Sequence, residues 1–340
     1  MFDKAITTLL PRLNGRASRR EFLRTAGGIA ALTAMPSALL ADQYPSRNVT
    51  FVVPFPPGGT PDILTRLLGR KLGEVYGRTF VIENRGGAGG SIAAEAVARA
   101  AADGYTLMMG HIGTLAVNVS IYPKLAYDPR RSFVPVSSVA KVNNLLVVNP
   151  SLPVNSVAEL IDYARKNPKK LNYSSGGNGS AAHIAMAAFA DAAKIEMTHV
   201  PYRGTAPSVT DLLAGQVQLT MTGTPAVIGH VHAGKLRALG LSGLKRLASE
   251  PNIPTIAETL PGFEANQWYG VVAPAGTPDA IVRQLNEDIR KAMSAPDVVD
   301  LLARDGAEVW VGSPEEFRAY IAQEIDRWAD LVHRANIRVD

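Results

Sequence analysis

The stretch that decides the fold is Val52-Val53-Pro54-Phe55-Pro56-Pro57-Gly58-Gly59-Thr60-Pro61-Asp62. A β-branched run ends in a Pro/Gly turn, and the start of a helix follows at once. Thr60 suits the N-cap, Pro61 suits the first helical position, and Asp62 complements the helix dipole. A strand that passes through a short turn into a helix predicts an α/β unit. Such proteins bind ligands where strand ends face helix N-termini, whose exposed amides attract anions such as carboxylates.

A second turn has the same construction. The segment Asn172-Tyr173-Ser174-Ser175-Gly176-Gly177-Asn178-Gly179-Ser180 leaves a predicted strand, and Ser180 suits the N-cap of the helix that follows. One such loop lies in each half of the chain. The pair therefore predicts a cleft in which two helix N-termini face one another.

Short β-branched runs alternate with Ala/Leu-rich helical stretches through the rest of the chain. We expect strands at 48–53, 80–83, 106–109, 136–148, 171–174, 197–200, 218–222, 237–241 and 268–273. We expect helices at 62–76, 91–102, 157–167, 181–193, 206–214, 224–233, 279–294 and 314–333. This alternation predicts parallel sheets covered by helices.

Composition narrows the class of protein. The 340 residues include no cysteine, which excludes disulfides, thiolate metal sites and cysteine nucleophiles. The net charge is +5, and residues 1–41, with six basic and two acidic side chains, account for +4 of it. The nearly neutral remainder is a poor match for a phosphate backbone, so nucleic acid is not an expected partner. No later segment reaches membrane-spanning length, so we expect the mature chain to be soluble and monomeric.

Residues 1–41 are typical of a signal peptide. The segment Ser18-Arg19-Arg20-Glu21-Phe22-Leu23-Arg24 is similar to the twin-arginine export signal, with arginine in place of the usual final lysine. An almost uncharged run, 25–41, follows it. We expect cleavage near Ala41 and a periplasmic location for the mature protein.

No motif for catalysis or cofactor binding stands out. The glycine-rich run 85–90 matches the spacing of neither the P-loop nor the dinucleotide-binding motif. Ser242 lacks the last glycine of a nucleophile elbow, and the six histidines lack metal-site spacing. We therefore expect no catalytic residue, no metal and no cofactor. An exported hydrolase stays an alternative, because a Ser/His/Asp set assembles in space rather than in sequence.

Eight segments, in order, resemble the tripartite tricarboxylate transporter substrate-binding family, the Bug-type extracytoplasmic receptors. They are Val53–Asp62, Glu83–Gly90, Asp103–Tyr105, Leu171–Ser175, Val200–Gly204, Ala233–Leu239, Trp268–Gly270 and Ala273–Pro278. The resemblance implies a type II periplasmic-binding-protein-like fold, with two α/β lobes around a ligand cleft joined by two crossing strands. On that model, lobe 1 comprises 43–143 and 267–340, with the C-terminal helices, and lobe 2 comprises 144–266. Trp268, at the return crossing, is then expected to report cleft closure.

The resemblance also implies a function. A receptor of this kind is not an enzyme; it captures a small carboxylate by cleft closure and delivers it to the membrane subunits of a tripartite transporter. The family's ligands include dicarboxylates, tricarboxylates, acidic amino acids and aromatic acids. The alternative is a sensor or adaptor that presents the same ligand to a membrane signalling protein.

The two loops and their neighbours supply the expected site. Amides of 58–60 and 177–180 would hold the carboxylate, with hydroxyls of the second loop assisting. Asp62 would orient a water, meet a ligand ammonium, or only compensate the helix dipole. The expected ligand-binding residues are Phe55, Pro56, Gly58, Gly59, Thr60, Asp62, His111, Thr114, Ser174, Ser175, Gly177, Gly179, Ser180, Tyr202 and Arg203.

Overall fold

Two β-sheets organise the protein, each covered by helices. The structure, a computed structural model, describes residues 44–334, and residues 45–334 fall in one unit. The predicted signal peptide and its cleavage site lie outside the described residues.

The first sheet has the strand order β11-β4-β10-β3-β1-β2. Its strands are β1 (Val49–Val53), β2 (Phe80–Asn84), β3 (Thr106–His111), β4 (Phe133–Val142), β10 (Gln267–Pro274) and β11 (Ala307–Val309). β1 pairs parallel with β2 and β3, whereas β10 pairs antiparallel with both β3 and β4. The predicted parallel pairing holds for β1, β2 and β3 but not for β10, which returns from the second sheet in the opposite direction.

The second sheet has the strand order β7-β6-β8-β5-β9. Its strands are β5 (Asn144–Val148), β6 (Asn172–Ser175), β7 (Thr198–Pro201), β8 (Leu219–Gly223) and β9 (Arg237–Leu241). β6 is parallel to β7 and β8, and β5 is antiparallel to β8 and β9. Along the chain, β4 of the first sheet is followed directly by β5 of the second sheet, with a single residue, Asn143, between them. The chain thus crosses abruptly from one sheet to the other.

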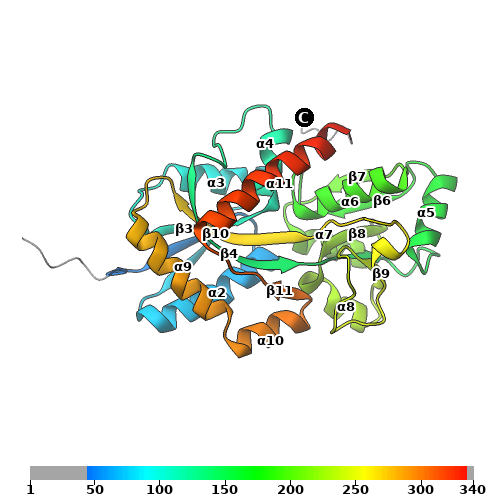
Figure 1. Ribbon diagram of the computed structural model, residues 1–340. Helices are drawn as coiled ribbons and strands as arrows, with labels where there is room; N and C mark the ends of the chain where they lie inside the picture. Colours follow the sequence, from blue (N-terminus) through cyan, green and yellow to red (C-terminus); the bar gives the residue numbers. More distant parts are fainter. Residues whose placement is uncertain (1–43, 335–340) are drawn as a thin grey trace, which may run out of the picture. The chain divides into compact units, whose positions relative to one another are not determined.

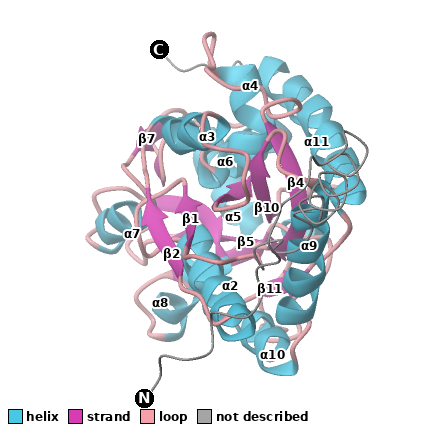
Figure 2. Cartoon of the chain, turned by 90° about the vertical axis from the view of Figure 1, so that its left-hand side faces the viewer, coloured by secondary structure: helices cyan, strands magenta, loops and turns pink. Residues whose placement is uncertain are grey.

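Helices cover both faces of the first sheet (Figure 2), with α3, α4 and α11 on one side and α2 and α9 on the other. The second sheet carries α5 to α8, and α11 runs across the side of β4 and β10 (Figure 1). The helices are α2 (Thr60–Tyr76), α3 (Ser91–Ala98), α4 (Asn118–Ile121), α5 (Val157–Lys166), α6 (Ala181–Ala193), α7 (Thr205–Leu213), α8 (Ile228–His232), α9 (Asp279–Met293), α10 (Pro296–Arg304) and α11 (Pro314–Arg334), with η1 (Ala88–Gly90), η2 (Gly113–Val117), η3 (Thr224–Ala226) and η4 (Ile256–Glu258) as short 3-10 or π turns.

We call the first sheet with its helices lobe 1 and the second sheet with its helices lobe 2. The two sheets, their helices and the crossing strands give the two-lobed α/β fold that the sequence predicts. One buried cluster of lobe 1 also takes in Ala181 and Ile184 from α6 of lobe 2. The start of α6 is therefore packed against both lobes.

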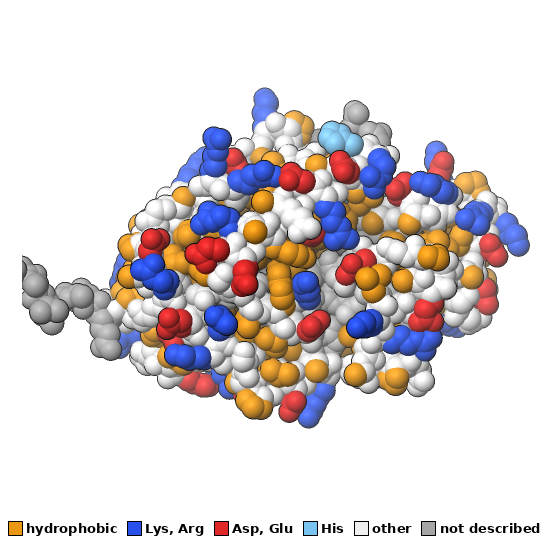
Figure 3. Space-filling view, viewed as in Figure 1, with side chains coloured by type: hydrophobic (Ala, Val, Ile, Leu, Met, Phe, Trp, Pro, Cys, Tyr) orange, Lys and Arg blue, Asp and Glu red, His pale blue; other side chains and the backbone are white. Residues whose placement is uncertain are grey.

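The surface in Figure 3 carries positive and negative side chains interspersed, with no broad field of one sign on the face shown. Such a surface offers no track for a nucleic-acid backbone on that face. Among residues 44–334, no helix is both long enough and apolar enough to cross a membrane.

Candidate functional site

The first loop leaves β1 at Val53 and enters α2 at Thr60. The N-cap is Gly59, with extended backbone, and not Thr60 as predicted. Gly58 has φ +89°, a conformation that favours glycine, and its amide donates to the carboxylate of Asp62 at 3.1 Å. The Thr60 side chain makes no capping bond; it lies against Gly223 of lobe 2, where an added Cβ would come within 2.5 Å of its Oγ1.

Asp62 is a structural carboxylate. Its oxygens accept hydrogen bonds from Arg66 (3.0 Å), from Asn84 Nδ2 (2.9 Å) and from the Gly58 amide. Burial raises the pKa of Asp62, but these hydrogen bonds and the Arg66 charge outweigh it and hold the pKa below its usual value. Both oxygens are engaged by these partners, which supports compensation of the helix start; the water or ammonium contact stays a prediction.

The second loop is held by its own side chains. Ser175 Oγ accepts from the Gly177 amide at 3.1 Å, and His183 Nδ1 accepts from the Gly179 amide at 3.1 Å. The Ser180 amide donates to Gly177 O, and Ser180 Oγ caps α6 through the His183 amide. Three of the amides expected to hold the ligand are thus occupied by acceptors in the loop or in the first turn of α6. The correction has a local cause, because a Gly-rich loop this tight must satisfy its own buried amides.

Two histidine side chains, His183 and His199, pack together beside this loop and hydrogen-bond to it. The rings of His183 and His199 stack with centroids 4.0 Å apart, and His199 Nε2 lies 2.6 Å from Ser175 Oγ. Burial lowers the pKa of His183 to about 4. Burial, and then the neighbouring His183, lowers the pKa of His199 to about 3. Both rings are therefore neutral at ordinary pH, which allows the close stack.

The two loops enclose a small hollow between the lobes, with a cavity volume of about 20 Å³. It is lined by Phe55, Thr60, Pro61, His111, Gly176, Ser180, Ala181, Ala182, Thr205, Thr222, Gln267 and Tyr269. No lysine, arginine, aspartate or glutamate is among these residues. We call this hollow the cleft cavity.

Three helices begin at the cleft cavity. Thr60, Ala181 and Thr205 are the first residues of α2, α6 and α7, which have 17, 13 and 9 residues. Within residues 44–334, the amides of these three residues and of Ala182 donate to no backbone carbonyl outside the helices, and amides in the first turn of a helix have no partner inside it. Each helix N-terminus carries roughly half a positive charge. The cavity therefore attracts an anion without any cationic side chain.

His111 ends β3 and forms part of the cavity wall, where it is 2% exposed. The Thr114 amide donates to its Nδ1 at 3.1 Å, while its Nε2 has no partner among the described residues. Burial lowers the pKa of His111 to about 3. The cavity thus contains one neutral imidazole with a free edge.

The floor of the cleft cavity is a polar chain on the crossing strands. Tyr269 Oη donates to Gln267 Oε1, and Gln267 Nε2 donates to Asn144 Oδ1. Asn144 Nδ2 then donates to Ala265 O at 2.6 Å. These groups satisfy one another across the junction of the two lobes, so they hold the floor of the cleft in one arrangement.

The cleft is nearly closed in this structure. A Cβ added to Gly113 of lobe 1 would come within 2.4 Å of Gly179 O in lobe 2, and one added to Gly204 within 3.0 Å of Pro56 Cγ. Tyr122 Oη of lobe 1 also donates to Asn178 O at 3.3 Å. Backbone-to-backbone approaches this close need residues without a Cβ.

The expected site residues divide into three groups. Four line the cleft cavity: Phe55, Thr60, His111 and Ser180. Eight shape its loops or support them from behind without lining it: Pro56, Gly58, Gly59, Asp62, Thr114, Ser175, Gly177 and Gly179.

Three of the expected residues lie elsewhere in lobe 2. Ser174 is buried and bonded to Ser208, Tyr202 donates to Asp211 at 2.7 Å, and Arg203 is exposed. None of the three lines the cavity, because their strand and turn direct them toward α7 or solvent.

The sequence reasoning missed eight lining residues: Pro61, Gly176, Ala181, Ala182, Thr205, Thr222, Gln267 and Tyr269. Thr205 could have been found by the rule used for the two loops, since it starts a helix directly after a glycine turn. Gln267 and Tyr269 carried no local signal beyond their place on the crossing strand.

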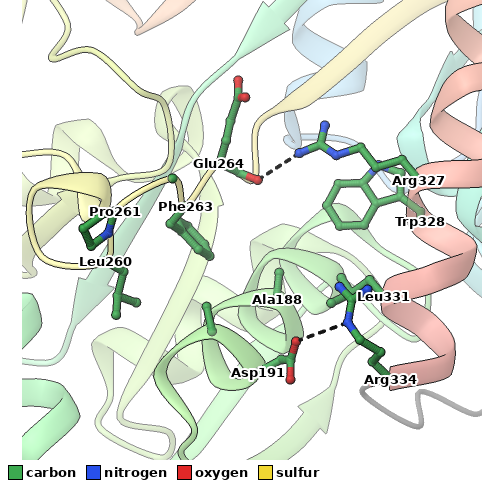
Figure 4. Close-up of a pocket in the computed structure, with 12 residues that line it drawn as sticks. Ala188, Asp191, Leu260, Pro261, Phe263, Glu264, Arg327, Trp328, Leu331 and Arg334 are labelled. Carbon is green, nitrogen blue, oxygen red and sulfur yellow. Dashed lines mark hydrogen bonds and ion pairs between the residues drawn. The ribbon is translucent and has the colours of Figure 1, made fainter.

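A second hollow lies between α11 and lobe 2 (Figure 4). Trp328 and Leu331 of α11 face Leu260 and Phe263 across it. Two ties flank it: Arg327 donates to Glu264 O at 3.2 Å, and Arg334 lies 3.8 Å from Asp191. We call it the outer groove. Nothing in it resembles the anion-attracting ends of the cleft cavity, and its two ties bridge the lobes.

Two lobes joined by crossing strands, with an uncharged anion-attracting cavity between them, define a solute-binding protein of the periplasmic type. Over residues 64–337 the chain matches the model of the tripartite tricarboxylate transporter family receptor. The chain belongs to this family, whose members are solute-binding receptors and not enzymes.

Individual relatives extend over almost the whole chain. Protein BugT of Bordetella pertussis is 37% identical, covering 94% of this chain and 98% of BugT. Rpa4515 of R. palustris, solved with adipate, is 42% identical with a TM-score of 0.85, covering 87% of this chain and 100% of that one. MatC of Rhodopseudomonas palustris, solved with bound malate, is 35% identical with a TM-score of 0.81, covering 85% and 100%.

Proposed function

We propose that this protein captures a small carboxylate in the cleft cavity and carries it to the membrane subunits of a tripartite tricarboxylate-type transporter in the periplasm. The observation that carries the proposal is the convergence of three helix N-termini on a cavity without charged side chains. Relatives that hold adipate and malate, and the periplasmic binding protein BugD among the structural neighbours, support it.

The carboxylate would lie against the amides of Thr60, Ala181, Ala182 and Thr205. Ser180 and Thr222 hydroxyls and His111 would complete its hydrogen bonds, with Phe55 and Tyr269 as an aromatic wall. The glycine loops would shape the site rather than donate to the ligand. In this scheme only neutral donors hold the charge, because the cavity lining contains no lysine or arginine.

Capture would proceed by closure of the lobes about their crossing strands. The proposed boundaries, 143/144 and 266/267, separate β4 from β5 and precede β10. Glycines 113, 179 and 204 would let the two faces meet, and the outer groove ties would form on the other side of the hinge. Closure would remove water from the ligand and strengthen each hydrogen bond to it.

A thermal-shift screen tests the proposal. Mature protein is heated with succinate, malate, adipate, citrate, glutamate, benzoate or nicotinate, with chloride as the anion control. A ligand at 100 times its dissociation constant adds about 2.7 kcal/mol to the free energy of unfolding. The acid recovered from the complex should be unchanged by chromatography. Stabilisation by none of the acids, or conversion of any of them in proportion to protein concentration, would reject the receptor.

A further inference from the structure

His111 has a fixed tautomer. The Thr114 amide donates to Nδ1 at 3.1 Å, while Thr114 Oγ1 donates to His111 O at 3.2 Å. A nitrogen that accepts an N–H bond carries no proton of its own in the neutral ring. The proton of the imidazole therefore sits on Nε2, which makes Nε2 an obligatory donor.

That donor is buried and unpaired. His111 is 2% exposed, and Nε2 is one of three buried side-chain atoms without a partner within residues 44–334. Buried donors in native proteins are nearly always paired, so an unpaired one calls for an explanation. The ring lines the cleft cavity with Nδ1 turned to Thr114, and its Nε2 edge lies beside Gly113, where Gly179 of lobe 2 approaches lobe 1.

The ring cannot turn to find another partner. Phe55 meets it edge to face at 4.7 Å, and Tyr269 stacks on it at 6.2 Å with planes 28° apart. The hydrogen bond that Nδ1 accepts from the Thr114 amide holds its inner edge. A ring fixed on three sides keeps Nε2–H at one place in the cavity.

The surroundings also keep the ring neutral. The elements that face it are the first loop, η2, the second loop and β10, and they contribute to the cavity no carboxylate and no amine. Tyr269 is the one other titratable side chain of the cavity lining, and burial raises its pKa. No counter-charge is present to stabilise an imidazolium.

We propose that His111 determines specificity: its neutral Nε2–H donates to an oxygen of the bound carboxylate, so the site selects ligands that place an acceptor there. This inference rests on the proposed function and adds to it which atom donates to the ligand and that the donor is neutral. A ligand with a methyl or methylene group at that point would leave the N–H buried and unpaired. Sites built to form a hydrogen bond reject ligands that lack the partner group most strongly for this reason.

Two variants separate the donor from the ring. His111→Phe keeps a planar ring against Phe55 and Tyr269 but removes the donor. His111→Gln places an amide N–H near the position of Nε2. With the tightest binder of the seven-acid screen as probe, calorimetry should show at least tenfold weaker binding for His111→Phe and recovery to within about threefold for His111→Gln. His333→Gln, at the exposed end of α11, is the control and should bind as the wild type does.

A spectroscopic readout keeps the test valid even if the variants unfold. In wild-type protein labelled with ¹⁵N-histidine, His111, His183 and His199 should all stay neutral from pH 5.5 to 8. The signal lost in His111→Phe, or the non-titrating signal that persists in the His183→Gln/His199→Gln double variant, identifies the His111 ring. It should have the Nε2–H tautomer throughout that range, and its Nε2–H proton should move downfield when the probe acid binds. Affinity should also stay flat over that range, because a neutral donor does not titrate.

The outcomes are distinct. Binding with an unshifted Nε2–H proton, a Nδ1–H tautomer, or affinity that falls as pH rises through about 6.5 would overturn the role of His111 and leave the receptor standing. Failure of all seven acids to bind would reject the proposed function and this inference with it.

Discussion

His183 and His199 stack almost in parallel, with their ring centroids 4.0 Å apart and their planes 7° apart. Each ring also supports the second ligand loop: His183 accepts the Gly179 amide, and His199 bonds the Ser175 hydroxyl that in turn accepts the Gly177 amide. The loop geometry therefore depends on two imidazoles that must both be neutral.

This dependence predicts a loss of stability in acid. Burial holds the pKa values of His183 and His199 at about 4 and about 3, below the unfolded value near 6.5. The unfolded chain then binds more protons than the folded one between pH 6.5 and 3, so stability falls as pH falls through that window. Urea unfolding should show about 1–2 kcal/mol lost per histidine between pH 7 and 5.

The matched variants are His183→Gln with His199→Gln, and His333→Gln as the exposed control. The double variant should start less stable at pH 7 but lose less between pH 7 and 5, whereas the control should follow the wild type. An undiminished slope in the double variant would show that the pair is not the source of the acid sensitivity.

The two glycine loops predict unequal effects of a single methyl group. Gly179 has φ +77°, and an added Cβ would lie 2.5 Å from Asn118 Oδ1 in lobe 1. Gly59 has φ −90°, and its Cβ would meet nothing closer than 3.5 Å. Gly179→Ala should weaken carboxylate binding at least tenfold, about 1.4 kcal/mol, and Gly59→Ala less than threefold.

Titration calorimetry with the best acid measures both, and ligand-free unfolding midpoints check that each variant folds. Equal effects from the two substitutions would mean that the close approach of lobe 2 to Asn118 does not accompany binding.

Asp62 predicts an effect on stability rather than on the ligand. Replacing it by asparagine removes the negative charge and one of the two acceptor oxygens that Arg66, Asn84 and the Gly58 amide share. A hydrogen bond to a charged group contributes about 1.5–3 kcal/mol. Asp62→Asn should lower the free energy of unfolding by about that much at pH values above the unfolded pKa near 3.9. The difference between variant and wild type should disappear in acid, because protonation of Asp62 removes the same charge from the wild type.

The control is Glu95→Gln in the exposed pair with Arg99, where about 0.5 kcal/mol or less is expected. Were Asp62→Asn instead to alter selectivity between adipate and glutamate at unchanged stability, the carboxylate would be meeting a ligand ammonium after all.

How far the sequence predicts this protein depends on the range of the interactions. The strand-to-helix turns at Gly59 and Ser180 rest on local backbone chemistry, and the sequence predicts their place to within a residue. The direction of β10 and the lining by Gln267 and Tyr269 arise only when segments more than 100 residues apart are brought together. The Gly179 amide was misjudged for a related reason, because its acceptor is a side chain that becomes a partner only once α6 has formed.

The export signal leads to a prediction that the structure leaves open, since residues 19–20 are outside the described part. If Arg19 and Arg20 are read by the twin-arginine pathway, replacing both by lysine should leave unprocessed precursor in the cytoplasm. Fractionation and immunoblotting measure it, with Arg12→Lys and Arg16→Lys as the charge-matched control. Normal processing of the Arg19/Arg20 variant would place export on another pathway.

Closure itself should be visible in tryptophan fluorescence, but from a residue other than the one that the sequence indicated. Trp268 is 1% exposed, donates to Glu324 at 2.8 Å and packs against Phe317 and Tyr320, all within lobe 1. Its neighbours on β10, Gln267 and Tyr269, line the cavity, and alternate residues of a strand point to opposite faces. Trp268 should therefore be silent when the lobes move.

Trp328 is placed to respond, because it lines the outer groove opposite Leu260 and Phe263 of lobe 2 (Figure 4). If the ligand-free protein opens, water reaches its ring, and ligand-driven closure should shift its emission to shorter wavelength. The experiment uses Trp268→Phe with Trp310→Phe, which leaves Trp328, and Trp310→Phe with Trp328→Phe, which leaves Trp268. We expect a ligand-dependent shift in the variant that keeps Trp328 and none in the variant that keeps Trp268. A shift from Trp268 alone would show that the motion is centred on the crossing strands and does not open the outer groove.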